Sequence, residues 1–179
     1  MKIALINENS QAAKNAQVEE VLKKVVEPKG HEVFNYGMYS AEDEHQLTYV
    51  QNGILAAILL NSGAADYVVT GCGTGEGAML ACNAFPGVLC GHIVDPSDAY
   101  MFAQINDGNA KERVVPEQRN KKILDEVKKV THNDLCTILK NLDRELVKGA
   151  IAGDRFSEYF FANCKCEKIA ACVKELLEA

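Results

Sequence analysis

No part of this sequence is apolar over a length that could cross a membrane. The most apolar stretch, residues 54–60, is short, whereas a transmembrane helix needs about 20 such residues. The chain also lacks an excess of positive charge, because its net charge is -6 and no long block of one sign occurs. A polyanion would be repelled. We therefore expect no membrane and no nucleic acid partner, and a small-molecule substrate fits better.

A regular disulfide framework is also missing. Seven cysteines are an odd number, their spacings are irregular, and the chain starts directly on a strand pattern without an apolar leader. Disulfide-rich secreted domains show even, ordered sets, so we expect free thiols and a cytoplasmic protein. Cys164 and Cys166 form a C-x-C pair without partners at zinc-site spacing. We expect neither a metal nor a cofactor.

Short apolar runs alternate with helical patterns through the first part of the chain. Strands are predicted at residues 2–6, 32–36, 65–70 and 88–94, and a helix is predicted after each of them. Four such units in series predict a parallel sheet with helices on both faces. The fold class is therefore α/β, a Rossmann-like three-layer sandwich.

Beyond residue 110 the alternation stops and only helical patterns remain. Helices are predicted at residues 120–130, 133–143 and 167–177, and Thr131 and Asp134 are spaced as a capping box. We therefore divide the chain into a Rossmann-like core, residues 1–110, and a helical C-terminal extension, residues 111–179.

The segment richest in potential chemistry is residues 71–77, with the sequence GCGTGEG. Ligands of an open parallel sheet bind beyond the carboxyl ends of its strands, where this loop should meet residues 7–10, 38–47 and 95–98. Its glycines allow close approach of backbone N–H groups to a ligand, and the N-terminus of the following helix attracts anions. Such surroundings favour a thiolate, so Cys72 is a candidate base or nucleophile. The plainer alternative is a tight turn around a small buried cysteine.

A dinucleotide site is a sharper alternative for the same loop. Gly73, Gly75 and Ala78 satisfy a loose G-x-G-x-x-A pattern, and Asp95 ends the next predicted strand, where a ribose-binding acid would lie. That fingerprint belongs after the first strand of a larger fold, whereas this loop follows the third. A non-catalytic nucleotide-binding module therefore remains the second hypothesis.

A wider set of residues resembles the signature of the ribose-5-phosphate isomerase B and galactose-6-phosphate isomerase family. It comprises Cys72-Gly73-Thr74-Gly75-x-Gly77, Asn83, Pro86-Gly87 and Asn106-Asp107-x-Asn109. The resemblance implies an aldose–ketose isomerase that works as a homodimer, or a dimer of dimers, with sites at the subunit interface. Cys72 would be the base of the enediol step. Thr74 and the amides of Gly73, Gly75 and Gly77 would hold the substrate and stabilise the enediolate, and Asn106 would orient a hydroxyl or carbonyl.

Several positions depart from the pentose phosphate enzymes of that family. Glu8-Asn9 replaces their Asp-His, and Ile105 replaces their ring-opening histidine. Their pair of phosphate-binding arginines is matched here only by Arg119, with Arg113 out of register. Residues 8–15, 45–49 and 95–99 resemble a narrower branch, the 4-deoxy-L-threo-5-hexosulose-uronate ketol-isomerases of glycosaminoglycan-degrading bacteria. An open-chain uronate needs no ring opening, and a carboxylate requires less positive charge than a phosphate.

The resemblance leads to the following expectations about the site. The substrate is this uronate, converted to 3-deoxy-D-glycero-2,5-hexodiulosonate, with ribose-5-phosphate or galactose-6-phosphate as alternatives. Besides the residues named above, binding is expected from Glu8, Asn9, Ser10, His45, Gln46, Arg113 and Arg119. His92 is expected to be a core residue of the fourth strand.

The resembling family also continues past residue 110 with a fifth strand and its helix. About 30 residues, one βα unit, have no counterpart in this chain. We therefore expect the sheet to end in an incomplete edge.

Overall fold

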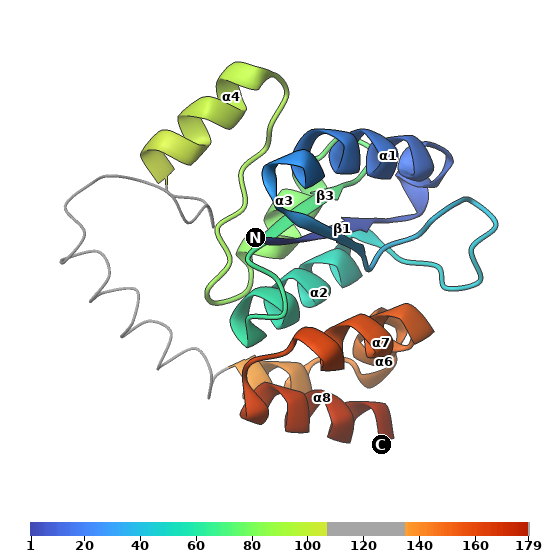
Figure 1. The fold of residues 1–179 in the computed structure, drawn as a ribbon. Helices are drawn as coiled ribbons and strands as arrows, with labels where there is room; N and C mark the ends of the chain where they lie inside the picture. The colour runs from blue at the N-terminus through green and yellow to red at the C-terminus, as the bar shows by residue number, and fades with distance from the viewer. Residues whose placement is uncertain (107–134, 179) are drawn as a thin grey trace.

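The structure is a computed structural model, and it describes residues 1–106 and 135–178 (Figure 1). Its centre is a parallel sheet in the order β2-β1-β3, formed by β1 (Lys2–Asn7), β2 (Glu32–Asn35) and β3 (Tyr67–Gly71). The last five residues of β1 are buried, as expected for a central strand that is covered on both faces. The predicted α/β, Rossmann-like class is confirmed.

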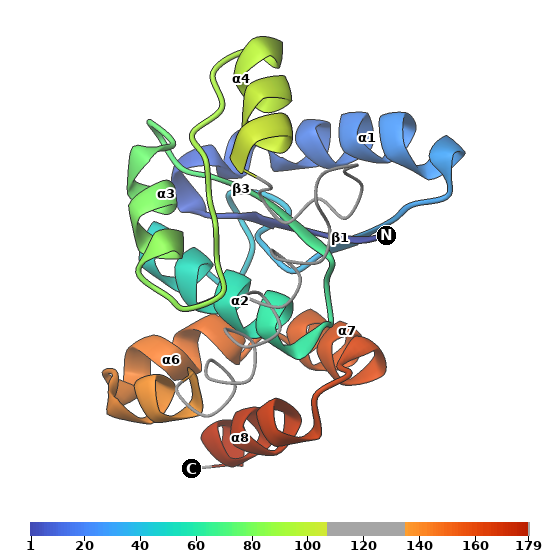
Figure 2. The same cartoon turned by 90° about the vertical axis from the view of Figure 1, so that its left-hand side faces the viewer.

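Helices cover the two faces of this sheet (Figures 1 and 2). A 3-10 turn, η1 (Asn9–Lys14), leads into α1 (Asn15–Val26), and a second, η2 (Glu27–Lys29), ends at Gly30 in the left-handed conformation. On the other face lies α2 (Tyr49–Ser62), which is buried around most of its circumference. Its start is determined by a capping box between Thr48 and Gln51.

The helix α3 (Glu76–Asn83) follows the glycine loop and packs closely on α2. Gly53 makes this approach possible, because a Cβ atom there would lie 2.6 Å from the carbonyl oxygen of Ala81. The loop 71–77 is therefore held between β3 and two helices in contact.

The predicted fourth strand, residues 88–94, is wrong. The segment forms no strand and leads to α4 (Pro96–Met101) and the π-helical turn η3 (Phe102–Asn106). The side chain of Asn83 accepts from the Cys90 N–H at 2.9 Å and donates to the Cys90 carbonyl at 2.8 Å. In a sheet, the N–H and carbonyl groups of Cys90 would instead bond to a neighbouring strand.

Because that strand is absent, β3 is an edge of the described sheet. This agrees with the expectation of an incomplete edge. The junction at residues 110 and 111 itself lies outside the described residues.

The C-terminal part is helical and packs on α2 (Figure 2). Residues 135–141 are helical, and α6 (Arg144–Ile151), α7 (Asp154–Asn163) and α8 (Glu167–Glu178) follow. Two of the predicted helices, 133–143 and 167–177, have described counterparts. The one at 120–130 and the Thr131–Asp134 capping box lie outside the described residues.

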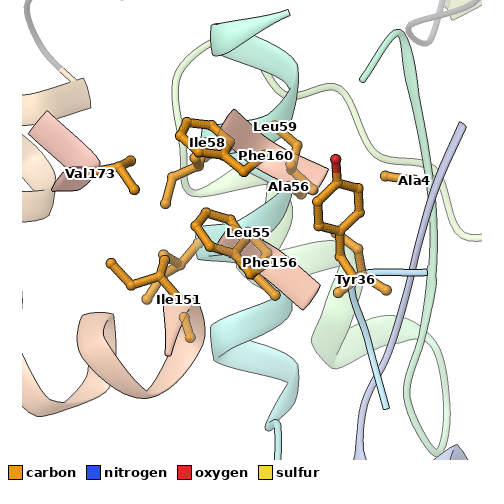
Figure 3. Close-up of a cluster of buried hydrophobic side chains, with 14 of the residues drawn as sticks. Ala4, Tyr36, Leu55, Ala56, Ile58, Leu59, Ile151, Phe156, Phe160 and Val173 are labelled. Carbon is orange, nitrogen blue, oxygen red and sulfur yellow. The ribbon is translucent and has the colours of Figure 1, made fainter. Parts of the chain in front are cut away.

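One hydrophobic cluster joins the sheet, α2 and the C-terminal helices (Figure 3). Phe156 and Phe160 of α7 stack with ring centroids 5.0 Å apart, and the Tyr36 ring meets Phe156 edge-on. Burying several large side chains of this kind contributes about 1.5–3 kcal/mol each. The helical extension is therefore part of the main core. Among the described residues, no helix is long and apolar enough to span a membrane.

Candidate active site

Loops that follow β1 and β3 meet at the carboxyl ends of the strands. The Gln11 side chain donates to the Cys72 carbonyl at 2.9 Å, and a Cβ atom on Gly73 would lie 3.6 Å from the Ser10 hydroxyl. The Asn9 N–H donates to the Leu47 carbonyl at 3.0 Å, which joins the loop after β2 to the same region. The structure thus brings together three of the four loops predicted to converge. In the fourth, Asp95 accepts from the N–H groups of Ser97 and Asp98 and so caps α4.

Cys72 is a free, half-buried cysteine at the start of the glycine loop. Its sulfur accepts hydrogen bonds from the backbone N–H groups of Gly75, at 3.2 Å, and Ala78, at 3.4 Å. Gly75 is the N-cap residue of α3 and Ala78 lies in its first turn, and the N-terminus of a helix favours negative charge. The loop reaches this shape because Gly75 has a φ of 86°, in the left-handed region. The arrangement suits a thiolate that accepts a proton.

The loop after β1 is closed by Glu8. Glu8 is 2% exposed, and its carboxylate accepts from both the N–H and the hydroxyl of Ser10. Asn9 and Ser10 are exposed, so their side chains remain accessible to a ligand, whereas Glu8 is engaged in its own turn. Beneath them, the buried Asn52 amide of α2 donates to the Ile6 carbonyl at 3.2 Å and to the Thr70 hydroxyl at 3.0 Å. Asn52 therefore holds the ends of β1 and β3 in place.

A cavity of about 540 Å³ opens beside the glycine loop. Its walls come from β3, the loop 71–75, α3, the segment 88–93 and Phe102, and Thr74 is exposed on it. Gly77 lies at the other side of the loop, against the ring of Tyr49. Of the residues described, no group of three or more histidines, cysteines or acids is arranged to hold a metal ion.

His92 lies on this cavity, and the expectation of a core residue is wrong. Its side chain is exposed, and a Cβ atom on Gly75 would lie 2.7 Å from its Cδ2 and Nε2 atoms. Without a fourth strand, the segment 88–94 passes over the glycine loop and carries the imidazole with it. Sequence patterns miss this placement because they treat residues 88–94 as part of the sheet.

Two further cysteines line the cavity as a pair. Cys82 of α3 and Cys90 share a side-chain hydrogen bond. That bond, together with burial, raises the pKa of the Cys82 thiol, and the same bond lowers the pKa of Cys90. These two thiols are engaged with each other, whereas Cys72 is held by backbone amides.

His45 and Gln46 are not among the residues that line the cavity beside Cys72. The His45 Nε2 atom lies 2.5 Å from the Gly149 carbonyl oxygen of α6, and the Gln46 amide donates to the Asp43 carbonyl at 2.5 Å. Both side chains stabilise the loop that carries them. Their predicted contact with substrate stays a prediction.

The same loop is bound to the helical extension by an ion pair that the sequence did not reveal. Arg155 of α7 lies 2.6 Å from the Asp43 carboxylate, and its guanidinium stacks over the Tyr39 ring at 3.8 Å from the centroid. Burial raises the pKa of Asp43, but hydrogen bonds from the Tyr39 N–H, the Arg155 side chain and the His45 N–H outweigh it. The pKa of Asp43 therefore lies below its ordinary value. Burial and the nearby Glu19 raise the pKa of Tyr39 to about 12.

Three predicted site residues cannot be compared with this geometry. Asn106 is the last residue of η3, and its side chain is not described. Arg113 and Arg119 lie outside the described residues.

Family models and solved structures match this chain over most of its length. A family model described as Ribose/Galactose Isomerase matches residues 3–131, and one described as Ribose-5-phosphate isomerase matches residues 130–176. A solved 4-deoxy-L-threo-5-hexosulose-uronate ketol-isomerase, complexed with a tartrate, is 52% identical, with a TM-score of 0.87 and 100% of each chain covered. A ribose-5-phosphate isomerase from Vibrio parahaemolyticus is 44% identical, with a TM-score of 0.87 and 99% of each chain covered.

A more distant structure, ribose-5-phosphate isomerase B of Clostridium thermocellum, shares the fold. It is 24% identical, with a TM-score of 0.53, and the match covers 99% of this chain and 96% of that one. The family models span nearly the whole chain, and the two nearer structures extend over its full length. The chain therefore belongs to the ribose/galactose isomerase family of aldose–ketose isomerases, as its glycine-loop signature predicted.

Proposed function

We propose that this protein converts 4-deoxy-L-threo-5-hexosulose-uronate to 3-deoxy-D-glycero-2,5-hexodiulosonate. The observation that carries the proposal is the 52% identity, over the full length of both chains, to an enzyme named for this substrate. That relative is complexed with a tartrate. Tartrate carries carboxylates and adjacent hydroxyl groups, and the sugar acid shares both features.

In this proposal Cys72 is the base. Its thiolate removes the proton from C2 of the open-chain aldehyde, and the resulting enediolate is protonated at C1. The N–H groups of Gly75 and Ala78, at 3.2 and 3.4 Å from the sulfur, hold Cys72 in place. Thr74 and the amides of the glycine loop would stabilise the enediolate oxygen, as donors do in an oxyanion hole.

The charge of the chain favours a carboxylate over a phosphate. Residues 1–110 contain no arginine, and Arg155 is paired with Asp43. A phosphate dianion usually needs an arginine pair or a strong nest of amides. We propose that Arg113 or Arg119 binds the substrate carboxylate from the following part of the chain.

The alternative substrates are ribose-5-phosphate and galactose-6-phosphate, and the 44% identity to the Vibrio enzyme supports the first of them. Steady-state kinetics of the purified protein on all three compounds tests the choice. We expect kcat/KM for the uronate to exceed that for either phosphate by at least about 100-fold, as the loss of a charged interaction implies. Comparable values for the uronate and ribose-5-phosphate would overturn the proposal.

We also propose that the protein assembles as a homodimer. Apolar side chains of α1 are exposed around a shallow hollow lined by Val18, Val21 and Val25. A second exposed apolar set lies on α3 and the segment that follows it, and includes Leu80 and Val94, 67% and 76% exposed. Apolar surface of this kind marks an interface, and a second copy of the chain would cover it.

A further inference from the structure

An aldose–ketose isomerisation moves two protons, and Cys72 accounts for one. The carbon-bound proton passes from C2 to C1, and a second proton must leave the C2 hydroxyl while another reaches the C1 oxygen. The oxygen protons need a general acid–base group within hydrogen-bond reach of O1 and O2. The thiolate alone does not supply it.

One imidazole is placed to serve this purpose. The ring of His92 lies directly over Gly75, the residue whose N–H donates to the Cys72 sulfur. His92 and Cys72 line the same cavity of about 540 Å³. Within residues 1–106 and 135–178, the His92 ring has no hydrogen-bond partner. Its nitrogens are therefore available to a ligand that enters from the cavity.

The other titratable groups on the cavity are less suitable. Burial raises the pKa of Tyr67 and keeps that phenol protonated. Cys82 and Cys90 are hydrogen bonded to each other. An imidazole is the side chain best suited to give and take a proton near neutral pH.

We propose that His92 is a catalytic residue that transfers the oxygen-bound protons of the isomerisation. This inference rests on the proposed isomerase function and names a second residue of the same site.

The proton transfers balance as follows. The Cys72 thiolate takes the C2 proton, the C2–H electron pair forms the C1–C2 double bond, and the carbonyl π pair moves to O1, which takes a proton from the His92 imidazolium. The neutral imidazole then removes the O2 proton, a C2–O2 double bond forms, and the enediol π pair takes the proton from the Cys72 thiol at C1. Both residues return to their initial protonation states.

The test uses His92→Gln and His92→Ala in the full-length protein, with His31→Gln as the matched control. His31 lies beside the N-terminus, with its Nδ1 atom 3.2 Å from the terminal amine. We expect kcat on 4-deoxy-L-threo-5-hexosulose-uronate to fall at least about 100-fold in both variants, while KM changes less than about threefold. In D2O, the ratio of deuterium entering C2 of recovered substrate to product formed should rise, because the enediolate reverts more often than it proceeds.

Several results would overturn the assignment. A kcat within about threefold of wild type, a rise in KM alone, or an equal fall in exchange and conversion would each give His92 a binding or structural role instead. If the wild-type protein does not convert the uronate, the proposed substrate is wrong. The same variants are then measured on ribose-5-phosphate, because the oxygen-bound protons move in any aldose–ketose isomerisation.

Discussion

At the scale of single residues, Cys72 is held by backbone and not by another side chain. Two N–H groups at the N-terminus of α3 donate to its sulfur, and amides held in place by the fold need no reorganisation when charge develops. The reactivity proposed for Cys72 therefore depends on the shape of the loop, which in turn depends on Gly75.

Replacement of Cys72 by alanine tests whether its sulfur is the base. We expect Cys72→Ala to lose about 10² to 10⁴ in kcat, the contribution of a general base, while its thermal unfolding midpoint stays close to wild type. The reason is that a half-buried sulfur leaves little cavity. Steady-state kinetics of Cys72→Ala measures the loss of kcat, and Cys166→Ala serves as the control. A Cys72→Ala variant that retains more than about a tenth of the activity would show that Cys72 is not the base.

Replacement of Gly75 tests the shape of the loop. An alanine there meets a positive φ of 86°, and its Cβ would overlap the His92 ring at 2.7 Å. Gly30→Ala is the matched control, because Gly30 has a φ of 80° with nothing within 4 Å of the added Cβ. The φ cost alone is about 1–2 kcal/mol.

We expect urea unfolding to show that cost in both variants and an additional loss in Gly75→Ala. Only Gly75→Ala should lose kcat, because only there is the imidazole displaced. Equal losses of stability in the two variants, with kcat unchanged in both, would contradict the described contact between His92 and the glycine loop.

At the scale of elements, the helical extension acts as a support for the loop between β2 and α2. Arg155 and the Gly149 carbonyl hold Asp43 and His45, and Leu47 at the end of that loop accepts from the Asn9 N–H. Hydrogen bonds thus join α6 and α7 to the loop between β2 and α2, and join that loop to the loop after β1 beside Cys72. We infer that the extension positions the site from a distance.

Removal of the guanidinium tests this support. Arg155→Ala leaves the Asp43 carboxylate, whose side chain is 11% exposed, without its cation. We expect a loss of about 1.5–3 kcal/mol in unfolding free energy and a decrease in kcat/KM through the loop. Arg144→Ala removes an exposed arginine at the start of α6 and should change neither. A stable Arg155→Ala protein would mean that the ion pair contributes little.

Acid should weaken the same ion pair, because the pKa of Asp43 is lower in the folded protein than its ordinary value. A carboxyl whose pKa is depressed by folding adds stability above its unfolded value, near 3.9, and loses it as the pH falls through the folded value. We therefore expect wild type to be more stable than Asp43→Asn between about pH 5 and 8, with the gap closing below about pH 4. Urea unfolding of both proteins across that pH range measures the difference in unfolding free energy. A gap independent of pH would contradict the charge-based account.

At the scale of the whole molecule, the cavity beside Cys72 lacks a described guanidinium. Arg155 is paired with Asp43, and Arg144 is exposed on α6. A substrate that carries a carboxylate and forms an enediolate needs a cation to offset the repulsion between them. We expect Arg113 or Arg119 of the second copy of the chain to supply it.

A mixture of two impaired variants tests this sharing. Arg113→Ala or Arg119→Ala alone should lower kcat/KM by about 1.5–3 kcal/mol, as for a lost charged hydrogen bond. When subunits of the more damaging variant are exchanged with Cys72→Ala subunits, one site of each mixed dimer is intact and activity reappears. Analytical ultracentrifugation verifies that dimers are present. A mixture that stays inactive would place the arginine and the cysteine of each site in one chain.

The sequence by itself determined the parallel βαβ units, the position of the reactive loop and the family. The apolar runs that became β1, β2 and β3 are local patterns. The glycine spacing around Cys72 is a short motif that allows close approach of backbone N–H groups to a ligand. The family membership also replaces the nucleotide-binding hypothesis.

Only the tertiary structure decided what surrounds Cys72. The apolar run 88–94 resembles a strand, yet the Asn83 side chain holds the backbone of Cys90, and the segment instead carries His92 over Gly75. Arg155 meets Asp43 across 112 positions of the chain, a separation at which no periodic pattern carries information. Local periodicity reports which face of an element is buried, whereas the partner of a polar side chain depends on the packing of distant elements.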